Sequence, residues 1–254
     1  MSFLIAVTGK GGVGKTTISA LLVTRLIALG KKPVLAVDAD PNTCLDSLLG
    51  VTASQTVGSV REETREIAGN GLASGISKQE LLELKIGQCL VEARDFDLIA
   101  MGRPEGPGCY CYANSVLKSV LSEISSQYPF VVLDNEAGLE NLSRRIVQKV
   151  DLLIMVSDTS YRGLETIRRL HSLSKEMEIH YDRLAIVLNR MRDERFPPLT
   201  ESLKNDTGAD IIIGLPEDIP LADMAETGNN IFSLPHDNPL NAKIDAFLEN
   251  ILIR

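Results

Sequence analysis

The feature that most constrains this chain is a glycine-rich loop near its beginning. The segment Gly9–Thr16 reads GKGGVGKT and fits the pattern G-x-x-x-x-G-K-[ST]. It directly follows the apolar run Leu4–Thr8 and opens the helix-like segment Thr16–Leu29. In that strand-to-helix context the backbone N–H groups of the loop surround phosphate oxygens, and the helix N-terminus adds partial positive charge. A chance glycine-rich turn would not require this spacing and context, so the sequence predicts a nucleotide site.

Two residues of the loop carry side chains with expected roles. Lys15 is expected to reach the β- and γ-phosphates, and the hydroxyl of Thr16 is expected to bind Mg²⁺. The other residues contribute mainly backbone N–H groups. The complete set that we expect to line the nucleotide is Gly9, Gly11, Gly12, Val13, Gly14, Lys15, Thr16 and Thr17.

Apolar runs alternate with helix-length segments along the chain. Continuous apolar runs are typical of strands buried on both faces, which form mainly parallel sheets. The pattern therefore predicts a doubly wound α/β fold with helices on both faces, and residues 1–254 are expected to form a single domain. The predicted strands are Leu4–Thr8, Val34–Asp38, Phe96–Met101, Phe130–Asp134, Leu152–Val156, Leu184–Asn189 and Ile211–Leu215, and the predicted helices are Thr16–Leu29, Asn114–Tyr128, Leu139–Lys149, Gly163–Met177 and Asn241–Leu252.

Composition argues against several classes of protein. The chain has 34 acidic and 26 basic residues, a net charge of −8, so nonspecific nucleic-acid binding is not expected. Its 4 cysteines are too few for a disulfide framework and predict thiols in a reducing cytoplasm. The apolar opening Met1–Val7 lacks a basic leader, and no stretch approaches the about 18 apolar residues of a membrane span. The segment Thr52–Ile86 reads as a variable surface insertion.

Lys10 is a second lysine inside the loop, and it has no evident role within its own subunit. The alternative interpretation is a solvated lysine on a turn. With this lysine the motif resembles that of the deviant Walker ATPases, which include the nitrogenase iron protein, the partition and Min ATPases and the metal-insertion ATPases. In that family the early lysine reaches the nucleotide of a partner subunit. The resemblance implies an ATP-dependent homodimer.

Three aspartates lie at the ends of predicted strands, at the edge of the sheet where ligands bind in such folds. The alternative interpretation is an ordinary turn, because Asp, Pro and Asn are also turn formers. Asp38 and Asp40 belong to Asp38-Ala39-Asp40-Pro41-Asn42, and Asp134 opens a D-x-x-x-G sequence that ends at Gly138. The resemblance implies that residues 38–42 are the first switch of the ATPase and that residues 134–138 are the second switch. The resemblance implies that Asp40 activates the attacking water and that Asp38 supports the Mg²⁺ shell. Asp134 is expected to hold Mg²⁺ through water, and the N–H of Gly138 is expected to donate to the γ-phosphate. Glu136 receives no role.

Two further positions concern the base. Asn189, at the end of a predicted strand, matches the residue that recognises adenine in the family, and Pro216 begins a Pro-Glu-Asp segment that matches a loop over the base. An asparagine at a strand end is also commonly a cap.

The pair Cys109-Tyr110-Cys111 is the most distinctive feature outside the loop. Two thiols supply half of the usual four ligands of Zn²⁺ or a thiolate-bound Ni²⁺, so two copies across a dimer axis would complete a site. The alternative is an incidental thiol pair, because free cysteine is usually a small buried hydrophobe. Cys44 and Cys89 are assigned to that alternative, and the three histidines to solvated or packed positions.

The cysteine pair and its neighbours, together with Asp40–Leu45 and Ala137–Leu142, most resemble the CooC-type nickel-insertion ATPases, which help to mature carbon monoxide dehydrogenase. The resemblance covers most of the chain and is poorest around 52–94. It implies a homodimeric ATPase that binds ATP, Mg²⁺ and Ni²⁺ and that serves a nickel enzyme client. Zn²⁺ is the alternative ion, because thiolates bind Zn²⁺ and Ni²⁺ alike. The resemblance implies neither a nucleic-acid partner nor a membrane partner.

Two alternatives of other classes stay open. The same four thiols of a dimer could hold an iron–sulfur cluster in an ATP-gated electron carrier. The nitrogenase iron protein, however, places its second cluster cysteine after the second switch, and 138–145 has none. A positioning ATPase of the Min or partition type is the second alternative.

Overall fold

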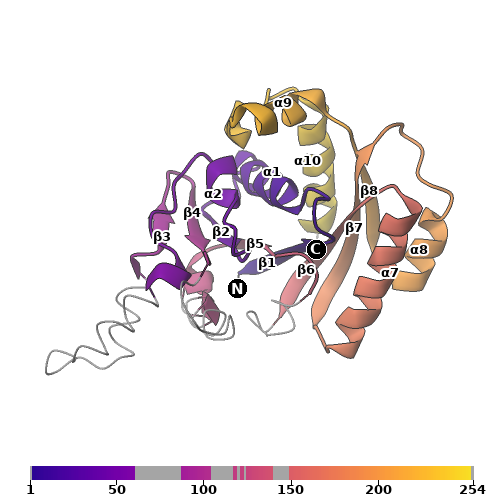
Figure 1. Ribbon diagram of the computed structural model, residues 1–254, viewed down its shortest axis with the longest axis horizontal. Coiled ribbons are helices and arrows are strands. Elements are labelled where there is room, and N and C mark those ends of the chain that lie inside the picture. The colour runs from indigo at the N-terminus through magenta and orange to yellow at the C-terminus, as the bar shows by residue number, and fades with distance from the viewer. Residues whose placement is uncertain are drawn as a thin grey trace, which may run out of the picture.

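A single sheet of eight strands organises the described chain (Figure 1). The computed structural model describes residues 2–60, 87–103, 117–118, 121–122, 124–139 and 149–252, and the following concerns these residues. The strand order is β3-β4-β2-β5-β1-β6-β7-β8, and every pair is parallel except β3 with β4. The strands are β1 Phe3–Gly9, β2 Val34–Asp38, β3 Leu90–Glu92, β4 Phe96–Ala100, β5 Phe130–Asp134, β6 Val150–Asp158, β7 Tyr181–Met191 and β8 Ile211–Pro216.

The central strands form because their side chains are apolar on both faces. Alternate residues of β1 enter two separate cores: Leu4 and Ala6 lie in one, and Ile5 and Val7 lie in the other. A strand with two buried faces needs a layer of helices on each side, which is the reason for the doubly wound arrangement. The predicted fold class is confirmed, and each of the seven predicted apolar runs is a strand.

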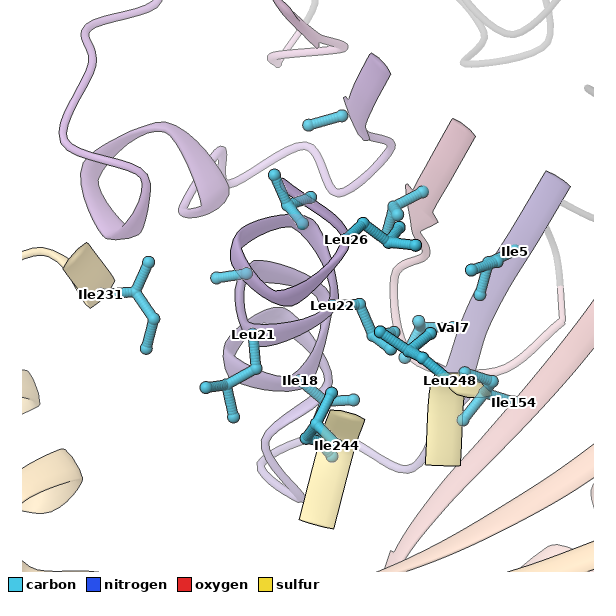
Figure 2. Packing of buried hydrophobic residues seen from close by; sticks show 14 of the residues in the cluster. Ile5, Val7, Ile18, Leu21, Leu22, Leu26, Ile154, Ile231, Ile244 and Leu248 are labelled. Atoms are coloured by element: carbon cyan, nitrogen blue, oxygen red, sulfur yellow. The ribbon is translucent and has the colours of Figure 1, made fainter. Parts of the chain in front are cut away.

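The helices cover the two faces in separate groups (Figure 1). The core that contains Ile5 and Val7 is closed by α1 and α10, and the core that contains Leu4 and Ala6 is closed by α7 and α8. Figure 2 shows Leu22 and Leu26 of α1 on its sheet side, near Val7. The helix bounds are α1 Lys15–Ala28, α2 Leu45–Leu48, α7 Tyr161–Glu176, α8 Thr200–Thr207, α9 Ile219–Thr227 and α10 Pro239–Leu252, with 3-10 turns η1 Ser125–Gln127 and η2 Ile231–Ser233.

The predicted helices and the observed ones differ in the shorter elements. The helices α2, α8 and α9 and the edge strand β3 were not predicted, because each is too short to show a clear period. The predicted helix 114–128 is helical at its described residues up to Gln127, the last residue of η1, and Tyr128 is extended. Residues 140–148 of the predicted helix 139–149 and residues 61–86 of the predicted insertion lie outside the described residues. Among the described helices, none is long and apolar enough to cross a membrane.

Candidate active site

The predicted nucleotide residues meet at the carboxyl edge of the sheet. In the strand register Val7 of β1 and Asp38 of β2 both pair with Asp134 of β5, so the loop after β1 lies beside the two acids. Asp38 and Asp134 each follow by two positions a residue of the core on the α1 side, Ala36 and Val132, and side chains two apart in a strand share a face. Both carboxyl groups are therefore on the same face of the sheet as α1, where a phosphate group at the helix N-terminus would lie.

The loop itself has the backbone geometry that phosphate binding needs. Gly14 caps α1 with a left-handed φ of 95°, and no side chain caps the helix and no acid lies in its first turn. The N-terminal N–H groups of α1 therefore keep their partial positive charge for an anion. A Cβ on Gly9, whose φ is 149°, would lie 2.3 Å from the carbonyl oxygen of Val156, so β6 leaves no room for a side chain there.

Lys15 is buried in this cradle, while Lys10 is exposed on the loop. The Nζ of Lys15 donates to the carbonyl oxygen of Lys10 at 3.3 Å. Burial lowers the pKa of Lys15, and the carboxylates of Asp134, Asp40 and Glu136 oppose that change. Glu136, which sequence reasoning left without a role, thus contributes negative charge near the phosphate-loop lysine.

Asp134 is fully buried and has one oxygen in need of a partner. Its Oδ1 accepts a hydrogen bond from the Ser19 hydroxyl at 2.9 Å, whereas its Oδ2 has no hydrogen-bond partner among the described residues. Burial raises the pKa of Asp134 to about 7, with a further contribution from Asp38. The hydroxyls of Thr16 and Ser19 lower the pKa. An unpaired carboxylate oxygen beside the Thr16 hydroxyl suits a hydrated Mg²⁺, so the residues fit this ion.

Sequence reasoning missed Ser19. The signal for it was available, because Ser19 follows Thr16 by three positions on α1 and so shares its helix face. That face carries a hydroxyl at two successive turns and directs both toward Asp134.

Asp38 is equally buried, but both of its oxygens are paired. Oδ1 accepts the N–H of Asp40 at 3.0 Å, and Oδ2 accepts those of Cys44 and Leu45 at 2.9 Å each. Burial raises the pKa of Asp38 to about 6, although these three N–H groups lower it. Asp38 therefore shapes the first switch. Within that loop the Oδ1 of Asp40 accepts from the backbone and side chain of Asn42 at 2.9 Å each.

The second switch is attached to the phosphate loop. Gly138, with a φ of 94°, donates its N–H to the carbonyl oxygen of Gly9 at 3.1 Å, and the Thr8 hydroxyl donates to the carbonyl oxygen of Gly138. The buried Asn135 donates from Nδ2 to the carbonyl oxygen of Val7 at 3.0 Å. The N–H that was expected to contact the γ-phosphate is thus engaged by the loop that holds the phosphates.

The two base-side residues lie at the ends of β7 and β8. Nδ2 of Asn189 donates to the carbonyl oxygen of Val13 at 2.9 Å, a contact that sequence reasoning did not anticipate. Pro216 is the last residue of β8, and Asp218 then caps α9 by accepting the N–H of Leu221 at 2.8 Å. Asp218 also accepts from Nδ2 of Asn238 at 2.9 Å, so α10 is linked to this loop.

The cysteines divide into two pairs. Cys109 and Cys111 lie outside the described residues. Cys89 is buried as expected, whereas Cys44 is exposed. Cys44 follows the first switch and directly precedes the short α2, and its assignment as an incidental thiol stays a prediction. Across the described ranges no group of three or more metal-ligating side chains occurs.

Comparison with known proteins agrees with this geometry. The family described as "AAA domain" (AAA_31) matches residues 2–186. The chain belongs to this family of P-loop ATPases. This family is of the ParA and MinD type, and membership in it makes the chain an ATP-binding ATPase. The assignment of the phosphate loop, Lys15 and Asp134 to its ATP site stays a prediction, which the geometry above supports.

Two curated relatives and two solved structures show the range of similar proteins. An uncharacterised ATP-binding protein of Methanocaldococcus jannaschii is 39% identical over 98% of both chains. The carbon monoxide dehydrogenase accessory protein CooC of Rhodospirillum rubrum is 33% identical over 69% of this chain and 70% of its own. A ParA family ATPase from Chlorobium tepidum has a TM-score of 0.72 at 20% identity and 97% coverage of both chains. MinD from Pyrococcus horikoshii with Mg-ADP has a TM-score of 0.70 at 20% identity, covering 100% of this chain and 97% of its own.

Proposed function

We propose that this ATPase is a nickel metallochaperone whose ATP-bound dimer holds one Ni²⁺ between two Cys109-x-Cys111 pairs and assists its insertion into carbon monoxide dehydrogenase or a related nickel enzyme. The observation that carries the proposal is the cysteine pair, in a chain that is 33% identical to a carbon monoxide dehydrogenase accessory protein. Two pairs supply the four thiolates that a soft ion takes, and one pair supplies only half of them.

In this proposal the hydrolytic step uses the described site. Water attacks the γ-phosphorus, the bond to the β,γ-bridging oxygen breaks, and ADP and phosphate form. Asp40 orients the water, Lys15 binds the phosphate oxygens, and Lys10 reaches the nucleotide of the partner subunit. Thr16 and Asp134 would hold Mg²⁺, which neutralises phosphate charge.

Hydrolysis can drive metal release only if Ni²⁺ binds one nucleotide state more tightly than the other. The first and second switches supply a connection to the nucleotide, since Asp38 shapes one and the other is hydrogen-bonded to Gly9. Residues 104–116, which contain the cysteines, begin shortly after β4. Because β4 and β2 are parallel neighbours, residues 101–103 after β4 and the first switch after β2 leave the sheet at the same edge.

The test is the stoichiometry of Ni²⁺ per chain, measured with and without a nonhydrolysable ATP analogue, together with the mass of the particle by light scattering. We expect one ion per two chains in the ATP-bound dimer, and its loss in Cys109→Ser. Cys44→Ser removes an exposed thiol outside the Cys109-x-Cys111 pair and is the matched control, which should keep the ion. Unchanged Ni²⁺ binding in Cys109→Ser, or a monomer in the presence of the analogue, would contradict the proposal. A brown chromophore after anaerobic reconstitution with iron and sulfide would favour the electron-carrier alternative instead.

A positioning ATPase is the second candidate, because ParA and MinD proteins share the fold. The described α10 gives little support to a membrane role. Its apolar residues pack in the core with α1, and Asp245 pairs with Arg25 of α1 at 2.6 Å. Co-sedimentation with anionic liposomes or with DNA in the presence of ATP would favour this candidate over the chaperone.

A further inference from the structure

The end of β7 lies on the far side of β6 from β1, and side chains there contact the phosphate loop. β7 continues past its regular pairing with β8, and the register shifts between Leu188 and Met191. In that irregular stretch Arg190 has a left-handed φ of 56°. A bulky residue adopts this conformation only at an energetic cost, and such strained positions cluster where a side chain must be aimed at a functional site.

Two consecutive side chains of this strand end bind two consecutive carbonyl groups of the loop. Nδ2 of Asn189 donates to the carbonyl oxygen of Val13 at 2.9 Å, and Nη1 of Arg190 donates to that of Gly12 at 3.4 Å. The fit is close, since a Cβ on Gly14 would lie 2.5 Å from Nδ2 of Asn189. Gly14 is thus required both by its left-handed φ and by the neighbouring amide.

The contacts have a direct consequence for the phosphate cradle. In a planar trans peptide the carbonyl and the following N–H point in opposite directions. Side chains that hold the carbonyl groups of Gly12 and Val13 toward β7 therefore turn the N–H groups of Val13 and Gly14 away from it. Those N–H groups belong to the loop segment that surrounds phosphate oxygens.

We propose that Asn189 and Arg190 are positioning residues that clamp the phosphate loop in its anion-binding conformation. The proposal rests on the ATPase activity and is independent of nickel. It also joins the two ends of the nucleotide site. The amide of Asn189 uses one N–H for Val13 and keeps its second N–H and its carbonyl oxygen for a base. The same side chain can therefore recognise adenine and hold the loop under the triphosphate.

Inorganic tripolyphosphate separates the clamp from base recognition, because it has the phosphates of ATP but no base. The measurement is its inhibition constant in the Mg²⁺-dependent ATPase assay, together with KM and kcat for ATP. The variants are Asn189→Ala and Arg190→Gly, and the second relieves the left-handed strain while it removes the guanidinium group. Arg190→Lys retains a cationic donor, and Arg192→Ala removes an exposed arginine two residues further along as the control.

We expect Asn189→Ala and Arg190→Gly each to raise the tripolyphosphate inhibition constant and the KM for ATP by up to about tenfold, which is the effect of losing one hydrogen bond to a neutral carbonyl group. The effect of Arg190→Gly should appear without a lower melting temperature, and Arg190→Lys should restore most of the affinity. An unchanged inhibition constant in Asn189→Ala, with only the KM for ATP raised, would reduce this residue to base recognition and overturn the clamp. Wild-type values in folded Arg190→Gly would overturn it as well.

Discussion

The two switch regions begin with aspartates in equivalent places, yet their carboxyl groups have different surroundings. Asp38 and Asp134 each end a buried strand, pair with each other in the register and lie fully buried on the same face of the sheet. Asp38 accepts three backbone N–H groups from its own loop. Asp134 accepts a hydroxyl from α1 and leaves Oδ2 without a partner. The first carboxylate organises a loop, and the second is left available for a ligand.

The largest expected difference concerns stability and pH. Burial raises the pKa of Asp134 from 3.8 to about 7, so the folded chain holds a proton that the unfolded chain releases. The free energy of unfolding should therefore fall as pH rises from about 4 to 7. Asp134→Asn should raise that free energy by about 2 to 4 kcal/mol at pH 8 and change it little at pH 4. Urea denaturation at both pH values measures the difference, and a variant less stable than wild type at pH 8 would contradict the assignment.

Asp134→Asn should also impair catalysis although it stabilises the fold. An amide cannot replace the charge that holds a hydrated Mg²⁺, so ATP hydrolysis should fall by about 10- to 100-fold. The fall should be smaller at saturating Mg²⁺, because the lost interaction is with the metal. A titration of ATPase rate against Mg²⁺ concentration tests this, and an unchanged Mg²⁺ requirement would remove Asp134 from the metal site.

Asp38→Asn should change stability at pH 8 far less than Asp134→Asn does. Burial raises the pKa of Asp38 only to about 6, so removing its charge stabilises the fold by a smaller amount. The new amide N–H₂ would also face backbone N–H groups, so at least one buried donor would lose its acceptor, at a cost of about 2 kcal/mol that offsets this gain. Asp46→Asn is the matched control, because Asp46 also accepts two backbone N–H groups but is less buried. Urea denaturation at pH 8 should show a free energy of unfolding near that of wild type in Asp38→Asn and in the control, and well below that of Asp134→Asn. Equal stabilisation in Asp38→Asn and Asp134→Asn would mean that the backbone N–H groups do not distinguish the two carboxylates.

The smallest expected effect concerns Ser19, which binds the paired oxygen of Asp134. Ser19→Ala removes that donor and should raise the pKa of Asp134 further, by about one unit. The midpoint of the rise of ATPase activity with pH should move upward by the same amount, with little change at high pH. Ser202→Ala, at an exposed position on α8, is the control. A pH profile that superimposes on wild type would show that Ser19 does not influence the carboxylate.

The sequence predicted the sheet far better than its surroundings. The runs Val34–Asp38 and Phe130–Asp134 match β2 and β5 residue for residue, since a strand buried on both faces is continuously apolar up to the aspartate that ends it. The two-turn α8 offered no comparable signal, because most of its residues face solvent. Among site residues, the loop motif located Lys15 and Thr16, whereas Ser19 and the second role of Asn189 depend on contacts over more than a hundred positions.

The order of residues along the chain determined which strands are buried on both faces, where the phosphate loop lies and which aspartates end beside it, because these depend on local period and on the carboxyl-edge rule for parallel sheets. Only the tertiary structure decided which carboxylate is satisfied. Whether a buried oxygen finds a donor depends on the distances that packing imposes, as when α1 brings the Ser19 hydroxyl within 2.9 Å of Asp134. A pattern of residue types carries no record of those distances.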